Sequence, residues 1–190
     1  MTNYPSTPLA YWSANAWDDH SRDHPVFAWF ERYTKEFFDQ RLYMTDAQHI
    51  KHWHTSDFTF VNPDGVPHSG VDKAFEVVRE TFGPFKAHLH SAKNGCMVPL
   101  DGEGKQGEKR WLLLAYADAY FDFAGDAKGV GKKVKSPDGK EWDYKAPSAY
   151  KFFFVEGTEE GNGGIALSRT EVFTDTHPLM AMVAEMQGGK

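Results

Sequence analysis

The chain of 190 residues has a single cysteine, Cys96. One thiol cannot form an internal disulfide, and it cannot supply a cysteine-based zinc cluster, so neither device holds this fold together. A lone cysteine fits a reducing compartment, in which Cys96 is expected to be a small buried residue.

Long apolar runs are missing as well. No stretch approaches the roughly 18 consecutive apolar residues that a transmembrane helix needs. The first 25 residues also lack the basic start and the continuous apolar run of a signal peptide. We therefore expect a cytoplasmic protein that does not enter a membrane.

Positive charge is scarce, because 21 Lys and Arg stand against 27 Asp and Glu, which gives a formal net charge of −6. Nucleic-acid binding needs a clustered basic surface, whereas the one basic run, Lys128 to Lys135, lies in a glycine-rich stretch typical of a loop. The sequence also contains no phosphate-binding loop and no nucleophile elbow. We expect neither a nucleic-acid partner nor a cofactor.

Aromatic residues, in contrast, are abundant: 15 Phe, 8 Tyr and 6 Trp make up 15% of the chain. With 41% hydrophobic residues in all, the chain can bury the core of one sizeable domain. Aromatic side chains fill cores, and they also form the walls of pockets for flat organic ligands.

The hydrophobic pattern has a helical period in the first half of the chain. After an extension over residues 1–25, a helix with an aromatic face that includes Tyr33 is predicted from Pro25 to about Arg41. A short second helix, capped by Thr45, is predicted to end near Trp53, and a third, capped by Ser69, to end near Phe82.

The second half has a strand period, which predicts an α+β fold. We expect residues 26–190 to form a single domain in which residues 125–147 are an inserted loop or hairpin. A short tail helix is predicted to begin at Pro178. Strands are predicted at 57–61, 85–93, 110–123, 148–156 and 165–174.

The segment SDFTFVNPDGVPHSGVDKAFEVV, residues 56–78, combines a strand, an Asn-Pro-Asp-Gly turn and a Ser-Gly pair before a helix. It resembles the NTF2-like superfamily, which includes SnoaL-like polyketide cyclases, scytalone dehydratases and ketosteroid isomerases. By order of elements the resemblance covers residues 26–174. It implies a cone of three N-terminal helices packed on a strongly curved antiparallel sheet, with a short C-terminal helix, and a homodimer formed through the exposed sheet face.

The resemblance to scytalone dehydratases also implies site residues. Those enzymes have an aspartate at the end of the first helix that orients a histidine on the strand after the third helix, and Asp39 and His88 stand at these places. Their second pocket histidine maps near Tyr120. A serine and an asparagine on a later strand map onto Ser148 and Tyr150.

Further positions follow from the family comparison. The tail helix of scytalone dehydratases closes the pocket with apolar side chains, and Leu179, Met180 and Met182 are the counterparts in this chain. Ketosteroid isomerases place a carboxylate base before the proline of the turn, where this chain has Asn62. Because an amide cannot accept that proton, we expect Asn62 to contact the ligand rather than to act as a base.

Alternation along the strands provides an independent test, since residues two apart share a face. On strand 110–123 the face with Tyr116, Asp118 and Tyr120 runs from apolar to polar, which predicts a pocket wall. His88 shares a face with His90, and Ser148 shares one with Tyr150. We expect His90, Tyr116, Ser148 and Tyr150 to contact the ligand.

His88 is the predicted general acid–base group, with Asp39 as the carboxylate that fixes its tautomer. A tyrosine, Tyr116, Tyr120 or Tyr150, would hold the developing enolate oxygen. Asp118 is the alternative base if it is buried beside tyrosines, since a carboxylate in an apolar site can take this role. The structural alternatives are a core histidine at position 88 and a strand acid facing water at position 118.

The His88-Leu89-His90 spacing suits a pair of metal ligands, but no third ligand follows at a convincing spacing, so no metal site is expected. These residues predict a cofactor-independent lyase or isomerase, dehydratase- or cyclase-like, that acts on a small cyclic or aromatic metabolite, polyketide-derived compounds included. The alternative is a non-catalytic module of the same fold for small-molecule binding or dimerisation. An enzyme needs Asp39 and His88 within hydrogen-bond reach at a cavity, whereas a binding module needs only the cavity.

Overall fold

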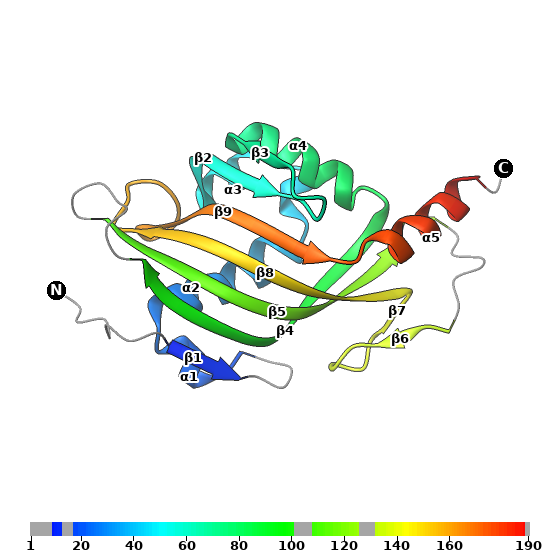
Figure 1. Ribbon diagram of the computed structural model, residues 1–190, viewed down its shortest axis with the longest axis horizontal. Helices are drawn as coiled ribbons and strands as arrows, with labels where there is room; N and C mark the ends of the chain where they lie inside the picture. Colours follow the sequence, from blue (N-terminus) through cyan, green and yellow to red (C-terminus); the bar gives the residue numbers. More distant parts are fainter. Residues whose placement is uncertain (1–8, 13–16, 101–107, 126–131, 189–190) are drawn as a thin grey trace.

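The computed structural model describes residues 9–12, 17–100, 108–125 and 132–188. Figure 1 shows a long curved sheet with α2 and α3 behind it, α4 along one edge and α5 at one end. In chain order the elements are β1 (Leu9–Trp12), α1 (Asp19–Arg22), α2 (Pro25–Arg32), the π-helix η1 (Tyr33–Phe38), the 3-10 helix η2 (Leu42–Met44), α3 (Ala47–Trp53), β2 (His54–Val61), β3 (Pro67–Ser69), α4 (Val71–Phe82), β4 (Phe85–Leu100), β5 (Lys109–Phe123), β6 (Val134–Lys135), β7 (Glu141–Trp142), β8 (Tyr144–Glu156), β9 (Ile165–Thr174) and α5 (His177–Gly188).

Over the described residues, the main sheet has seven strands in the order β1-β4-β5-β8-β9-β2-β3. Neighbours pair antiparallel except β2 and β9, which are parallel, so the expectation of a purely antiparallel sheet was wrong at this point. β2 and β9 come from distant parts of the chain and no hairpin joins them, which frees them to run in the same direction. The register of β4 against β5 shifts between Phe85 and Ala87 and again between Ala92 and Asn94. Such irregularities bend a strand, and they give the sheet the curvature of a cone.

The core lies between the concave face of the sheet and the helices, and it is largely aromatic. Phe37, Phe58 and Phe75 are almost completely buried there and contact one another or His54. On β5 the concave face carries Trp111 and Leu113, which belong to this core. The α+β cone expected from the sequence is confirmed.

Helix starts are partly as predicted. α2 begins at Pro25, with His24 as its cap. α3 is capped by Asp46 and not by Thr45, because the Asp46 carboxylate accepts from the Gln48 backbone N–H at 2.7 Å. Ser69 does not cap α4 either: its hydroxyl is bonded to that of Thr59, and Gly70 takes the cap position with φ of 89°.

The strands are longer than their patterns indicated. β4 continues to Leu100, β2 starts at His54 and β8 starts at Tyr144, while β9 has the predicted bounds. Part of the N-terminal extension joins the sheet, since β1 pairs with β4 from Leu9 opposite Met97 to Trp12 opposite Asn94. None of the described helices is both long enough and apolar enough to cross a bilayer.

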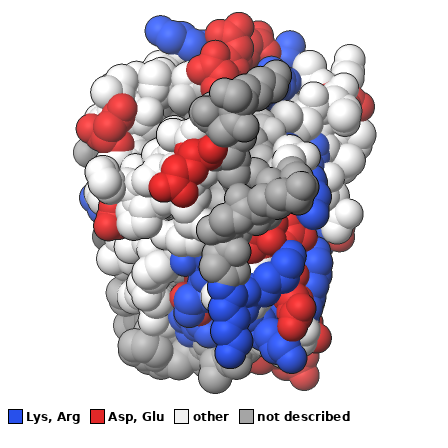
Figure 2. All heavy atoms as spheres, turned by 90° about the vertical axis from the view of Figure 1, so that its right-hand side faces the viewer, with Lys and Arg blue, Asp and Glu red and all other residues white. Residues whose placement is uncertain are grey.

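Within the predicted 125–147 insertion, the described residues form the β6–β7 hairpin, which lies on the convex face of the sheet, and the start of β8. Trp142 packs against Tyr120 of β5. The Asp143 carboxylate, which is paired with Lys133 at 2.7 Å, also accepts from the Phe123 backbone N–H at 3.0 Å and so attaches the hairpin to β5. Figure 2 looks at this end of the molecule and shows Lys and Arg gathered in its lower half, with acidic side chains among them. No residue of 132–145 lines the cavity described below.

Candidate active site

A cavity of about 150 Å³ lies inside the cone, between the helices and the concave face of the sheet. A cavity of roughly this volume can hold one aromatic ring. Its aromatic wall consists of Trp17, Phe30, Tyr33, Phe38, Phe58, Phe60, Phe75, Phe82, Phe85, Tyr116, Phe121, Tyr150 and Phe152. Polar lining residues are few: Thr34, Thr81, His90, Asn94, Ser148, Thr170, Thr174 and Thr176. Among the described lining residues His90 is the one histidine, and none is Asp, Glu, Lys or Arg.

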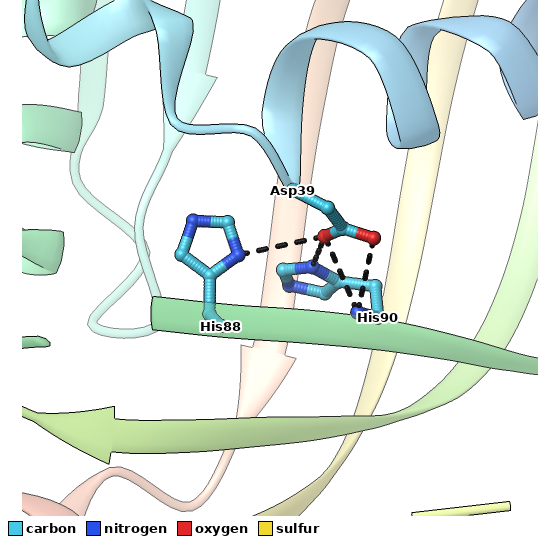
Figure 3. Close-up of side chains that lie close together, drawn as sticks. All are labelled: Asp39, His88 and His90. Carbon is cyan, nitrogen blue, oxygen red and sulfur yellow. Dashed lines mark hydrogen bonds and ion pairs between the residues drawn. The ribbon is translucent and has the colours of Figure 1, made fainter. Parts of the chain in front are cut away.

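Asp39 contacts two histidines, His88 and His90, of which His90 lines the cavity (Figure 3). Asp39 follows the π-helix η1, and both histidines come from β4. The carboxylate accepts from His90 Nδ1 at 3.0 Å and from the His90 backbone N–H at 3.3 Å. His88 Nδ1 lies 3.5 Å from the same oxygen, which is a longer contact. The predicted Asp39–His88 proximity is therefore present, and the carboxylate is shared with His90.

The environment of Asp39 favours its charged form. Burial alone raises the pKa of this carboxyl, but the polar interactions with His88 and His90 outweigh burial and hold the pKa below its ordinary value. An ionised Asp39 accepts the Nδ1 proton of His90, so the unprotonated nitrogen of that ring is Nε2.

His88 lies deeper than His90. Its side chain has no exposed surface, whereas that of His90 is 14% exposed. The His88 Nε2 atom is 2.8 Å from the Tyr43 hydroxyl. Burial, partly offset by Asp39, lowers the pKa of His88 to about 4, so this ring is neutral near pH 7. His88 is not among the residues that line the cavity.

The ligand atoms of Asp39, His88 and His90 lie within 4.8 Å of one another, a separation that a divalent metal ion could bridge. The Asp39 carboxylate already accepts from His90 twice. His88 Nδ1 lies 3.5 Å from it without a hydrogen-bond partner, and His88 Nε2 is bonded to Tyr43. We therefore describe the three residues as a hydrogen-bonded cluster.

Tyr150 on β8 lies edge-on to the His90 ring, with ring centroids 6.1 Å apart, and both side chains line the cavity. Burial raises the pKa of Tyr150 to about 12, with Ser148 acting in the opposite direction, so the hydroxyl keeps its proton at neutral pH. A protonated hydroxyl beside a histidine can donate to a ligand oxygen. Ser148 and Tyr150 line the cavity as the alternation along β8 predicted.

The predicted face of β5 was wrong. Leu113, Ala115, Ala117 and Phe121 line the cavity, so the opposite set of side chains points outward. Asp118 and Tyr120 belong to this outer set: Asp118 is paired with Lys145 (3.2 Å) and Lys93 (3.4 Å), and Tyr120 is covered by Trp142. Tyr116 still borders the cavity, with 40% of its surface exposed.

Of the other predicted ligand contacts, some line the cavity and some do not. Tyr33 and Leu179 line the cavity. Asn62 does not, because its side chain accepts from the Val66 backbone N–H at 3.2 Å within the turn. Met182 packs against the cluster around Phe85 beside the cavity, and Met180 takes the lining position on α5.

Three residues of the site lacked a usable signal in the sequence. Tyr43 follows the predicted end of the first helix, Asn94 follows the predicted end of a strand, and Trp17 lies in the extension. The alternation His88, His90, Ala92 could have reached Asn94 had the strand been extended further.

No protein-family model matches the chain, and no curated protein matches it either. Among solved structures it is similar to the Kfla4162 protein from Kribbella flavida, with a TM-score of 0.54 and 20% identity over 83% of this chain and 93% of that chain. It is also similar to Aln2 from a Streptomyces species, with a TM-score of 0.52 and 13% identity over 82% of this chain and 92% of that chain. ActVI-ORFA from Streptomyces coelicolor matches with a TM-score of 0.50 and 14% identity over 79% of this chain and 94% of that chain. At such identities the likeness is one of fold, and it agrees with the α+β cone described above.

Proposed function

We propose that the protein is a cofactor-independent lyase or isomerase that removes a proton next to a carbonyl group of a small ring compound. The observation that carries this proposal is the position of His90, which lines the cavity while its Nδ1 atom is held 3.0 Å from the Asp39 carboxylate. A neutral imidazole whose other nitrogen is bonded to a carboxylate is a suitable general base near neutral pH.

The proposed step begins when His90 Nε2 takes the proton from the carbon beside the carbonyl. The electrons of the broken C–H bond form an enolate, whose oxygen accepts a hydrogen bond from the Tyr150 hydroxyl. Elimination follows when these electrons expel a hydroxyl group that the imidazolium protonates, which releases water. Isomerisation follows when the imidazolium returns its proton to a different carbon.

This assignment moves the base from His88, the group favoured by the sequence, to His90. His88 Nε2 is bonded to the Tyr43 hydroxyl, and the ring lies outside the cavity lining. We propose that His88 positions Asp39 and does not touch the substrate.

The cavity also suggests what the substrate is like. Since the described lining contains no Lys, Arg, Asp or Glu, a charged group inside the cavity would be desolvated without an ionic partner. The proposed substrate is therefore a neutral ring compound of about one ring with a carbonyl edge toward His90 and Tyr150.

A non-catalytic binding module is the second candidate. It is favoured by the aromatic and apolar character of most of the lining, which would hold a flat molecule without any chemistry. The two candidates differ in what they require of His90: a binding module loses only affinity when that side chain is replaced, whereas an enzyme loses turnover.

The test begins with native mass spectrometry of the gently purified protein, which identifies a retained molecule. Exchange of the methyl protons of acetophenone, a neutral single-ring ketone, is then followed by ¹H NMR in D₂O. The wild type is expected to accelerate exchange, and His90→Gln to reduce that acceleration about 100-fold or more. Asp118→Asn, a carboxylate change on the outer face, is the matched control and should leave the rate within about twofold of the wild type.

Equal rates for the wild type and His90→Gln would contradict the proposed base. Exchange with no acceleration, combined with a retained ligand, would favour the binding module. Addition of a chelator or of Zn²⁺ completes the test, since a strict requirement for the metal would contradict the cofactor-independent mechanism.

A further inference from the structure

We infer that Trp17, a residue of the N-terminal segment, limits the length of the ligand that the cavity accepts. The inference rests on the proposed use of the cavity as a ligand site, but not on the proton transfer. Trp17 is one of the lining residues and lies outside the segment, residues 26–174, over which the sequence resembles the NTF2-like superfamily.

A row of lining rings runs from the proposed base to Trp17. Tyr150 lies edge-on to His90, and Phe152 stacks on Tyr150 with centroids 5.4 Å apart. Phe30 lies 4.4 Å from Phe152. Trp17 meets Phe30 edge-on at 5.9 Å, so it stands at the far end of this row from His90. A substituent that projects away from the reacting carbonyl along the row would approach the Trp17 indole.

Arg22 links the backbone of Trp17 to helix α2. The Arg22 guanidinium binds both oxygens of Glu31 on α2, at 2.7 and 2.9 Å, and the same group donates to the Trp17 carbonyl at 3.2 Å. Glu31 is itself buried, with 7% exposed. A paired fork of this kind is geometrically specific, and it attaches the backbone of Trp17 to α2.

The N-terminal segment is also attached to the sheet, through the pairing of β1 with β4. β1 runs along β4, and Trp12 lies opposite Asn94, which is another lining residue. Figure 1 shows α1 beside β1, which is the edge strand of the sheet and pairs with β4. The segment that carries Trp17 is therefore attached on both sides of the residue, as a wall that limits ligand length must be.

The size of the indole decides the expected effect. Trp17→Ala removes an indole, the largest of the natural side chains, from the end of the cavity. The space that it leaves extends the cavity beyond Phe30. Because one methylene in an apolar pocket changes selectivity about 10- to 200-fold, the loss of an indole should change it at least tenfold.

The experiment compares acetophenone with 4-acetylbiphenyl, which carries a second ring opposite the carbonyl. Dissociation constants are measured by calorimetry or by ligand-observed NMR for the wild type, Trp17→Ala and Trp17→Phe. Preference for the longer ketone is expected to rise tenfold or more in Trp17→Ala and by a smaller factor in Trp17→Phe, which keeps an aromatic ring and the fold. Trp142→Phe, the same conservative change in the β6–β7 hairpin, is the control and should leave the preference unchanged.

Unchanged preference in both Trp17 variants, with both ketones still bound, would overturn the inference and leave the proposed function standing. A preference that shifts while proton exchange is absent from every protein would support the inference and contradict the enzyme. If neither ketone bound to any variant, the inference and the ligand-binding use of the cavity would fall together.

Discussion

Asp39 serves two histidines that lie in different surroundings. His90 reaches the cavity, whereas His88 has no exposed surface and is bonded to Tyr43. The deeper ring is neutral near pH 7 because burial lowers its pKa to about 4, so it lies 3.5 Å from the carboxylate without adding charge. The carboxylate thus keeps its negative charge available for the imidazolium that forms on His90 during proton transfer.

Replacement of Asp39 by Asn should separate orientation from binding. Asp39→Asn keeps the size of the side chain but removes the charge that stabilises protonated His90. We expect the saturated exchange rate to fall about 10- to 100-fold, while the dissociation constant for acetophenone stays within about twofold, because Asp39 is not a lining residue. The rate and the affinity are measured by NMR and calorimetry on the same preparation.

His88→Gln is the companion variant. Loss of the Tyr43 and Asp39 contacts should lower the free energy of unfolding by about 1–3 kcal/mol, and the rate should fall less than in Asp39→Asn. A larger loss of rate in His88→Gln than in His90→Gln would return the role of base to His88.

At the scale of single elements, the π-helix η1 is what aims Asp39. The backbone N–H of Asp39 donates to the Thr34 carbonyl at 2.8 Å, five residues back, so one extra residue is accommodated before the helix ends. This changes the direction of the following side chains relative to a continuous α-helix, and π-turns occur often at functional sites. Arg41, with φ of 58°, then reverses the chain toward η2.

Deletion of Glu36 should remove the extra residue and convert η1 into regular α-helix. Glu36 is exposed and takes part in an ion pair with Arg32 at 3.5 Å, so few buried contacts are lost directly. Because each α-helical residue turns the chain by about 100°, Asp39 should lose its contact with His90, and exchange should fall to the level of Asp39→Asn. Charge reversal by Glu36→Lys, which keeps the chain length, should retain the wild-type rate; full activity in the deletion would contradict the role given to η1.

The π-helix η1 and the orientation of β5 are two features that the sequence pattern did not predict. The spacing of Phe27, Phe30, Tyr33 and Phe37 predicts a helix correctly, but an α-helix with one π-turn buries nearly the same positions, so the pattern does not distinguish them. On β5, Asp118 and Tyr120 looked like pocket groups because polar residues gather at pocket mouths. They are instead covered by lysines and by the β6–β7 hairpin, and local alternation gives no information about such distant contacts.

Other parts of the site could be predicted from the sequence. The juxtaposition of Asp39 and His88 followed from the resemblance, and the lining role of Ser148 and Tyr150 followed from the period of two, since β8 has no register shift within that stretch. Trp17 could not be predicted, because its place depends on the Arg22–Glu31 pair and not on any periodic pattern.

For the molecule as a whole, buried histidines couple stability to pH. Burial lowers the pKa of His54 to about 3 and that of His88 to about 4, from 6.5 in both cases. Between these lowered pKa values and 6.5, the unfolded chain binds more protons than the folded one. The contribution of the neutral rings to the free energy of unfolding is therefore fully present above about pH 6.5, and it declines as the pH falls toward 4. Urea titrations between these pH values should show a decline on the order of 3 kcal/mol from His88, which His88→Gln lacks; equal slopes in both proteins would contradict the buried neutral ring.

The convex face of the sheet leaves large apolar side chains in contact with solvent. Leu114 and Phe173 are 42% and 49% exposed, and they border a shallow hollow that also includes Cys96. The β6–β7 hairpin covers the sheet around Tyr120, so the bare part of this face is limited to one region. Exposed apolar patches on a curved sheet favour association, and we expect two copies to pack through this region.

Light scattering coupled to gel filtration should then give twice the chain mass of 21.5 kDa for the wild type. Phe173→Asp and Leu114→Asp should each shift the mass toward that of one chain, because a carboxylate buried in an apolar interface has no partner there. Val66→Asp, at a residue 47% exposed on the turn between β2 and β3, is the matched control and should remain a dimer. A monomeric wild type, or a dimer that survives both aspartates, would assign the bare face to a different role.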